Sequence, residues 1–66
     1  MITLVINGES KEVSATSLEG LLAELSLPSS LMLVEYNGKA LLRSEWHAVR
    51  LSEGDRLELM QVSAGG

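Results

Sequence analysis

Hydrophobic and polar residues alternate at the start of the chain, from Ile2 to Ile6. A period of two predicts a strand with one face buried in the core. Asn7 and Gly8 follow, and both residues tolerate the positive φ angles of a type I′ hairpin turn. The return segment, residues 9–13, is charged almost throughout, which suits an edge strand that must not pair with other chains.

After this hairpin the hydrophobic spacing changes from the period of a strand to that of a helix. Four leucines form one apolar helical stripe: Leu18, Leu21, Leu22 and Leu25. We predict a helix over residues 17–25 that ends before Pro28. Thr16 and Glu19 are spaced as a capping box, in which the Thr16 hydroxyl accepts a hydrogen bond from the backbone N–H of Glu19.

The second half of the chain divides into shorter segments with their own turn signals. In the last of them, the alternating Leu57 and Leu59 are expected to face the core. The predicted segments are a buried strand over 31–36, a turn at Asn37 and Gly38, a short return over 39–42, a helical turn over 43–47 anchored by Trp46, a brief strand at Val49 and Leu51, a turn over 52–55 and a final strand over 56–62.

The length and the order of the elements together predict a fold class. Sixty-six residues are enough for one domain, and we assign residues 1–62 to it. A hairpin, a helix, a strand, short elements and a last strand indicate an α+β fold, in which one main helix packs on one face of a mixed β-sheet. A last strand placed beside the first would run parallel to it, because the helix provides the crossover.

The composition argues against several classes of function. The chain has nine acidic residues, five basic residues and no basic run, which argues against nucleic-acid binding. It contains no cysteine and only one histidine, His47, so it offers neither a set of metal ligands nor a catalytic triad. We therefore expect a protein without a metal site and without catalytic residues of its own.

The apolar run at the N-terminus also bears on location. It covers only residues 1–6 and follows no basic stretch. Such a run is too short for a signal peptide or a membrane span. We expect a cytoplasmic protein that does not associate with a membrane.

The sheet face opposite the helix is predicted to carry exposed apolar side chains. Those expected there are Val5, Leu33, Met60 and Val62. Glu35 and Glu58 would add negative charge to the same face. An apolar and acidic face beside the chain end indicates a docking surface for a partner protein, although scattered apolar residues on a surface need no function.

The chain ends on two glycines, Gly65 and Gly66, preceded by Ser63 and Ala64. Because glycine lacks a Cβ atom, the last peptide units are narrow and conformationally free. We predict that residues 63–66 form a flexible tail that enters an enzyme channel and presents the Gly66 carboxylate. The chain has no nucleophile or base near this carboxylate, so a partner would activate it. The alternative interpretation is an ordinary loose terminus.

Five short segments occur in an order typical of a known family. They are Val5-Ile6-Asn7-Gly8, Tyr36-Asn37-Gly38, Arg43-Ser44-Glu45-Trp46, Gly54-Asp55 and Val62-Ser63-Ala64-Gly65-Gly66. Their order, together with the Gly-Gly end, resembles the ubiquitin-like β-grasp proteins and, within that group, the ThiS family of small sulfur carriers. The resemblance covers essentially the whole chain, although no single motif is specific.

The resemblance implies a function for the last residue. In such carriers an E1-like adenylyltransferase of the ThiF or MoeB type uses ATP to adenylate the terminal glycine, here Gly66. Sulfur from a cysteine desulfurase or another donor then gives a thiocarboxylate, and a ThiG-type thiazole synthase takes the sulfur into the thiazole of thiamine. The resemblance therefore implies a monomeric carrier that is not an enzyme and binds no cofactor of its own.

Two alternatives remain open at this point. A MoaD-like carrier would serve molybdopterin synthesis, and related carriers serve other sulfur metabolites. MoaD-like carriers tend to have two prolines where this chain has Gln61 and Val62, which favours the thiamine pathway. The second alternative is a β-grasp interaction module that binds partners non-covalently through its sheet and makes no use of its last residues.

Overall fold

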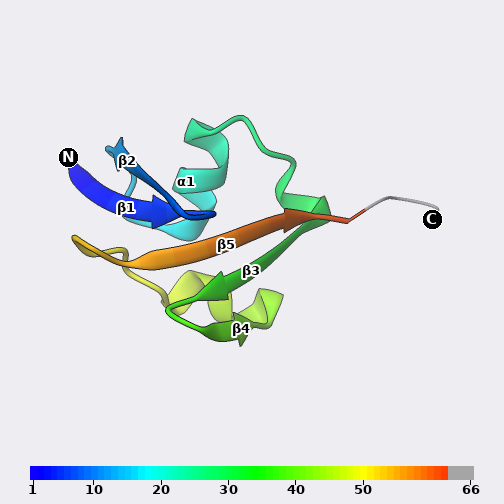
Figure 1. The fold of residues 1–66 in the computed structure, drawn as a ribbon. Helices are drawn as coiled ribbons and strands as arrows, with labels where there is room; N and C mark the ends of the chain where they lie inside the picture. The colour runs from blue at the N-terminus through cyan, green and yellow to red at the C-terminus, as the bar shows by residue number, and fades with distance from the viewer. Residues whose placement is uncertain (63–66) are drawn as a thin grey trace.

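A computed structural model describes residues 1–62 of the chain (Figure 1). None of the helices within this range is both long enough and apolar enough to cross a bilayer. The strands are β1 (Ile2–Ile6), β2 (Glu9–Val13), β3 (Met32–Tyr36), β4 (Lys39–Leu41) and β5 (Arg56–Gln61), and the helices are α1 (Leu18–Glu24) and the 3₁₀ helices η1 (Ser29–Leu31) and η2 (Arg43–Ala48).

The five strands form one mixed sheet in the order β2-β1-β5-β3-β4. β1 and β5 are parallel, and the other neighbouring strands are antiparallel. α1 packs against one face of the sheet (Figure 1). These features confirm the predicted α+β class, the position of the charged β2 at an edge, and the parallel pairing of the first and last strands.

The core lies between α1 and the inner face of the sheet. Leu18, Leu21 and Leu22 on the helix are fully buried, whereas Leu25 is only half-buried. The predicted helical stripe and the predicted strand faces are therefore confirmed. The buried residues are Leu4, Ile6, Val13, Leu18, Leu21, Leu22, Met32, Val34, Trp46, Leu51, Leu57 and Leu59.

Both Asn-Gly pairs form the predicted turns. Asn7 and Gly8 have φ angles of 51° and 84°, and Asn37 and Gly38 have φ angles of 49° and 86°. Two successive residues with positive φ are the signature of a type I′ turn, whose twist matches that of the strands it joins.

The predicted capping box is wrong, because α1 begins one residue later than we expected. The N-cap is Ser17, whose Oγ accepts a hydrogen bond of 3.0 Å from the backbone N–H of Gly20. The third helical residue is then Gly20 rather than Glu19, and glycine has no side chain to complete a box. Thr16 lies outside the helix and accepts a backbone hydrogen bond from Leu51.

The predicted strand at Val49 and Leu51 is also wrong. The segment between η2 and β5 has no strand assignment, although Leu51 is buried and its N–H bonds to the Thr16 carbonyl at 2.9 Å. A single backbone bond to a loop does not make a ladder. Three strand ends also differ: Leu31 belongs to η1, and Leu42 and Val62 fall just outside β4 and β5.

The predicted helical turn is a six-residue 3₁₀ helix, η2, and Trp46 anchors it as expected. The Trp46 side chain is only 3% exposed and belongs to the core cluster. The guanidinium carbon of Arg43 lies 4.7 Å from the centroid of its ring, which is within the range of a cation–π contact.

Candidate functional site

The outer face of the sheet, opposite α1, carries an apolar patch at the end where β5 leaves the fold. Leu33 on β3 and Met60 on β5 are paired directly across the two strands, and each is 52% exposed. Val62, two residues after Met60, is 40% exposed. We call Leu33, Met60 and Val62 the apolar patch. Three of the four residues predicted for a docking surface thus lie at the base of the predicted tail.

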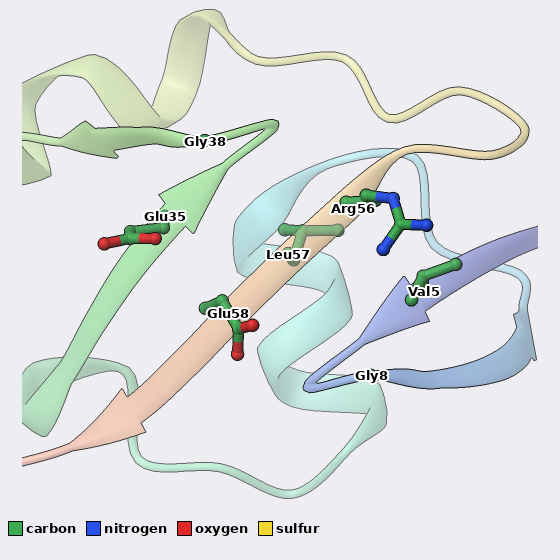
Figure 2. Close-up of a pocket in the computed structure, with 7 residues that line it drawn as sticks. All are labelled: Val5, Gly8, Glu35, Gly38, Arg56, Leu57 and Glu58. Atoms are coloured by element: carbon green, nitrogen blue, oxygen red, sulfur yellow. The ribbon is translucent and has the colours of Figure 1, made fainter.

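Val5, the fourth predicted residue, lies elsewhere on the face. It is half-buried on β1 and paired with Arg56 at the start of β5. Figure 2 shows Arg56 reaching from β5 toward the β1 side, with Val5 beside it. Val5 lines a shallow hollow of about 230 Å³ together with Gly8, Glu35, Gly38, Arg56, Leu57 and Glu58. The structure therefore separates Val5 from the apolar patch.

The hollow is lined by two acidic side chains and one basic side chain, Arg56, which Figure 2 shows turned toward β1. Glu35 on β3 and Glu58 on β5 are direct cross-strand partners. Like charges in this position repel each other, so a cation from a partner would relieve the repulsion. The outer face consequently offers an apolar end and an acidic middle, as the sequence indicated. A second shallow hollow, of about 260 Å³, adjoins the patch and is lined by Leu33, Val34, Glu35, Ala40, Leu41 and Met60.

The backbone holds the base of the predicted tail. The N–H of Val62 donates to the carbonyl of Leu31 at 2.7 Å, which extends the pairing of β5 past its last strand residue, Gln61. The predicted tail itself, Ser63 to Gly66, lies outside the described residues. Its role stays a prediction.

The two turn asparagines have contacts that the sequence reasoning missed. Asn7 pairs with Leu59 through both ends of its side-chain amide. Asn37 accepts from the N–H of Arg56 at 2.8 Å. Both asparagines therefore bond to the backbone of β5, from opposite sides of the strand. The Asn-Gly signal pointed only to turn geometry, and no sequence pattern reveals which strand a turn side chain reaches.

Asp55 fixes the start of β5, a role that its place in the Gly54-Asp55 segment did not reveal. Its carboxylate accepts hydrogen bonds from the Tyr36 hydroxyl at 2.7 Å, the Ser52 N–H at 2.8 Å and the Asn37 side chain at 3.2 Å. Partial burial raises the pKa of Asp55, but these hydrogen bonds outweigh it and hold the pKa below its usual value of 3.8. The hydrogen bond between the Tyr36 hydroxyl and Asp55 also raises the pKa of Tyr36. The final strand is thereby tied to β3 at its first residues.

This network predicts a loss of stability in acid. Because the pKa of Asp55 is lower in the folded than in the unfolded state, its contribution is present above about pH 4 and is lost as the pH falls through the folded value. Tyr36→Phe removes one donor to this carboxylate. We expect the difference in unfolding free energy between the wild type and Tyr36→Phe to shrink as the pH is lowered from 6 to about 2.

Urea unfolding at a series of pH values measures this difference. The pKa of Glu24 is also lowered, mainly by a hydrogen bond from the Ser14 N–H. Glu24 is present in both proteins, so its effect cancels in the comparison. A difference that stays constant over the whole range would contradict the assignment to Asp55.

The described part of the chain contains no cluster of three or more metal-binding side chains. His47 is exposed on η2. These observations give no support to a metal site within residues 1–62.

A five-stranded mixed sheet in this order, with one helix on one face and a last strand in its centre, defines the ubiquitin-like β-grasp class. The model of the ThiS family matches residues 4–66, so the chain belongs to the ThiS family. The resemblance inferred from the sequence is thus confirmed.

Two solved structures agree with this assignment. The crystal structure of the thiamine biosynthesis protein ThiS from Geobacter metallireducens superposes with a TM-score of 0.82 at 28% identity, over 98% of this chain and 100% of that one. An NMR structure of a thiamine biosynthesis protein from the same organism gives a TM-score of 0.78 at 28% identity, over 98% and 88% of the two chains.

Two relatives are similar in sequence. A thiazole synthase of Paramagnetospirillum magneticum is 39% identical over 64 residues, which are 96% of this chain but only 20% of that protein. The uncharacterized protein ycf40 of Trieres chinensis is 31% identical over 65 residues, covering 97% of this chain and 89% of that one. The chain therefore spans about a fifth of the first relative and most of the second.

Proposed function

We propose that this protein is a sulfur carrier for thiamine biosynthesis and that Gly66 is its point of attachment. The observation that carries the proposal is that the ThiS family model matches through residue 66 and so includes the Gly-Gly end. The fold supports it, because β5, the last strand, runs through the centre of the sheet (Figure 1).

The proposed chemistry takes place at one carboxylate. A partner joins the Gly66 carboxylate to AMP from ATP and releases pyrophosphate, which turns a poor electrophile into a good one. A persulfide on the sulfur donor attacks the acyl carbon and expels AMP. A second thiol then reduces the acyl disulfide, and a thiocarboxylate remains on Gly66. The carrier supplies the acyl group and the docking surface, and its partners supply the catalytic groups.

The proposal names three partners. An E1-like adenylyltransferase of the ThiF or MoeB type performs the activation, and a cysteine desulfurase or another donor supplies the sulfur. A ThiG-type thiazole synthase receives it. The similarity to part of a longer thiazole synthase supports this last partner, since fused domains commonly act on the same substrate. A monomeric carrier in the cytoplasm suits these successive encounters.

Mass spectrometry of the intact protein tests the proposal. Incubation with the activating enzyme, ATP and a sulfur donor should raise the mass by about 16 Da, the difference between a sulfur and an oxygen atom. Supply of the product to a thiazole synthase should return the mass to its first value. Transfer to molybdopterin synthesis instead would favour the MoaD-like alternative.

The exposed apolar patch keeps one other function in consideration. A non-covalent interaction module would also use Leu33 and Met60, but it would not need its last residues. Removal of Gly65 and Gly66 separates the two functions. A module binds its partner unchanged after this removal, whereas the carrier loses its chemistry.

The apolar patch gives a prediction of its own. Met60→Glu places a charge opposite Leu33, beside the existing Glu58. Burial of that charge against a partner is unfavourable. We expect affinity for the activating enzyme to fall by about tenfold or more, as is typical when a central interface residue is lost. Isothermal titration calorimetry measures this affinity for the wild type and for Met60→Glu.

Ala23→Glu is the matched control for this prediction. Ala23 is exposed on α1, on the other side of the sheet, and the substitution adds the same charge at a helical position. Affinity should remain at the wild-type value. Equal losses for the two variants would mean that net charge rather than the apolar patch governs binding.

A further inference from the structure

The side chain of Asn7 continues the sheet where β1 ends. Its Nδ2 donates to the carbonyl of Leu59 at 3.2 Å, and its Oδ1 accepts from the N–H of Leu59 at 2.8 Å. Its own backbone N–H donates to the carbonyl of Leu57 at 2.9 Å. One side-chain amide thus satisfies both backbone groups of a residue in β5, as the peptide group of a neighbouring strand would.

This contact fills a gap in the sheet. The pairing of β1 with β5 has only two partners in register, Val5 with Arg56 and Ile6 with Leu57. Beyond them β1 turns away into the hairpin, so no strand of residues 1–62 lies beside the second half of β5 on that side. Without the Asn7 amide, the backbone of Leu59 would have water as its only partner there.

The end of β5 is held from its other side as well. Its register with β3 runs to Gln61, opposite Met32, and the Val62 N–H then bonds to the Leu31 carbonyl at 2.7 Å. Leu59 is three residues before Val62 and four residues before the start of the predicted tail at Ser63. Contacts on both sides restrict the direction in which the chain leaves the sheet.

We propose that Asn7 is a positioning residue for the carboxyl-terminal tail. Its amide takes the place of a neighbouring strand and sets the path of β5 toward the tail, so that a partner docked on the sheet meets the acyl end in the right place. This inference depends on the proposed carrier function. Formation of the turn alone does not require an asparagine at position 7, because glycine also accepts the φ angle of 51° found there.

Asn37 provides a matched comparison. It has nearly the same φ angle, 49°, and it too bonds to β5 through its side chain. Its partner there is Arg56, the first residue of the strand, at the end away from the tail. Asn7→Gly and Asn37→Gly therefore remove similar bonds and keep both turns, but only the first loosens β5 near its exit.

The kinetics of adenylation distinguish positioning from simple destabilisation. We expect Asn7→Gly to lower kcat about tenfold with KM changed less than about twofold, because the docked carrier presents its end incorrectly. Asn37→Gly should keep the wild-type kcat. A destabilised carrier would instead show a raised apparent KM at unchanged kcat. That result for Asn7→Gly, or equal losses of kcat in both variants, would overturn the proposal.

A second measurement does not need the activating enzyme. Asn7→Asp puts a carboxyl at the position of the amide: protonated, it offers one donor and one acceptor. Ionised, it still accepts from the Leu59 N–H but cannot donate to the Leu59 carbonyl, and its charged oxygen repels that carbonyl oxygen and pushes the side chain away from Leu59. We expect amide exchange at Leu59, relative to the wild type at each pH, to be near normal in acid and about tenfold faster at neutral pH. The charged residues on neighbouring elements are Glu9, Glu35, Arg56 and Glu58, and they are common to both proteins.

A ratio of exchange rates that does not vary with pH would show that the Asn7 amide does not hold β5 at Leu59, and would overturn the proposal. The two measurements also separate the proposal from the function on which it depends. If the wild type is never adenylated, the carrier function fails, and the exchange at Leu59 still shows whether Asn7 holds the strand. If the wild type is adenylated and Asn7→Gly matches it in kcat, the positioning role alone fails.

Discussion

Deletion of Gly66 will abolish the mass gain of about 16 Da on incubation with the activating enzyme, ATP and a sulfur donor. The shortened chain still ends in a glycine carboxylate, Gly65, but that carboxylate stops about 3.5 Å short of the original position. A misplacement of about 1 Å is enough to slow a reaction by about a hundredfold. Sulfur transfer should therefore fall below detection over the same incubation.

The deletion should leave every other property of the protein unchanged. The buried core residues lie between Leu4 and Leu59, so the unfolding temperature should match that of the wild type. The apolar patch, represented by Leu33 and Met60, is intact, so affinity for the activating enzyme should change little. A full mass gain on the shortened chain would exclude Gly66 as the attachment point, even if the protein carries sulfur elsewhere.

Replacement of Trp46 by alanine will unfold the protein at 25 °C. Trp46 is 3% exposed and belongs to the one core cluster of the described residues. Deletion of a buried tryptophan side chain costs about 3–5 kcal/mol. A core of this size supplies no more than about 3–5 kcal/mol in total, so the substitution removes most or all of the stability. Far-ultraviolet circular dichroism and urea titration measure the loss.

Two smaller changes at the same place serve as controls. Trp46→Phe keeps most of the aromatic volume and removes the indole Nε1, a buried atom that has no hydrogen-bond partner among residues 1–62. We expect a loss of only about 1–2 kcal/mol, because the cavity is smaller and no hydrogen bond is broken. Arg43→Ala removes the cation above the ring and should cost about 1 kcal/mol or less. A folded Trp46→Ala protein would show that η2 does not depend on this anchor.

The periodic segments of the chain were predicted well because their signals are local. Alternation from Ile2 to Ile6, and at Leu57 and Leu59, fixes which side of each strand is buried once one face is apolar. The leucine stripe does the same for α1. The Asn-Gly pairs select the turn type through their φ angles alone. The fold class and the family follow from the order of these local signals.

The two wrong predictions, the capping box and the strand at Val49 and Leu51, concern segments where the sequence is compatible with more than one structure. Thr16 and Ser17 are both good N-caps, and the sequence does not say which one starts the helix. The structure selects Ser17, and the Thr16 carbonyl pairs with Leu51 instead. Val49 and Leu51 have the spacing of a strand, but a strand requires a neighbour, and the segment receives only that one bond.

The candidate site was also predicted only in part from the sequence. The sequence predicted an apolar outer face, and the structure brings Leu33 and Met60 together but places Val5 with the acidic hollow. The division depends on strand order and register, which are set by contacts between distant parts of the chain. The roles of Gly66 and of residues 63–66 remain predictions.

The amino-acid sequence by itself determined most of the elements, their buried faces, the acidic surface and the Gly-Gly end, because each of these depends on residues close together in the chain. Only the tertiary structure decided how these parts meet: the apolar patch at the base of the tail, the Asp55 network, and the Asn7 amide beside Leu59, 52 positions away. A side chain near the N-terminus finds its partner in the last strand because the crossover through α1 places β5 next to β1. That adjacency is a property of the folded chain and of no local segment.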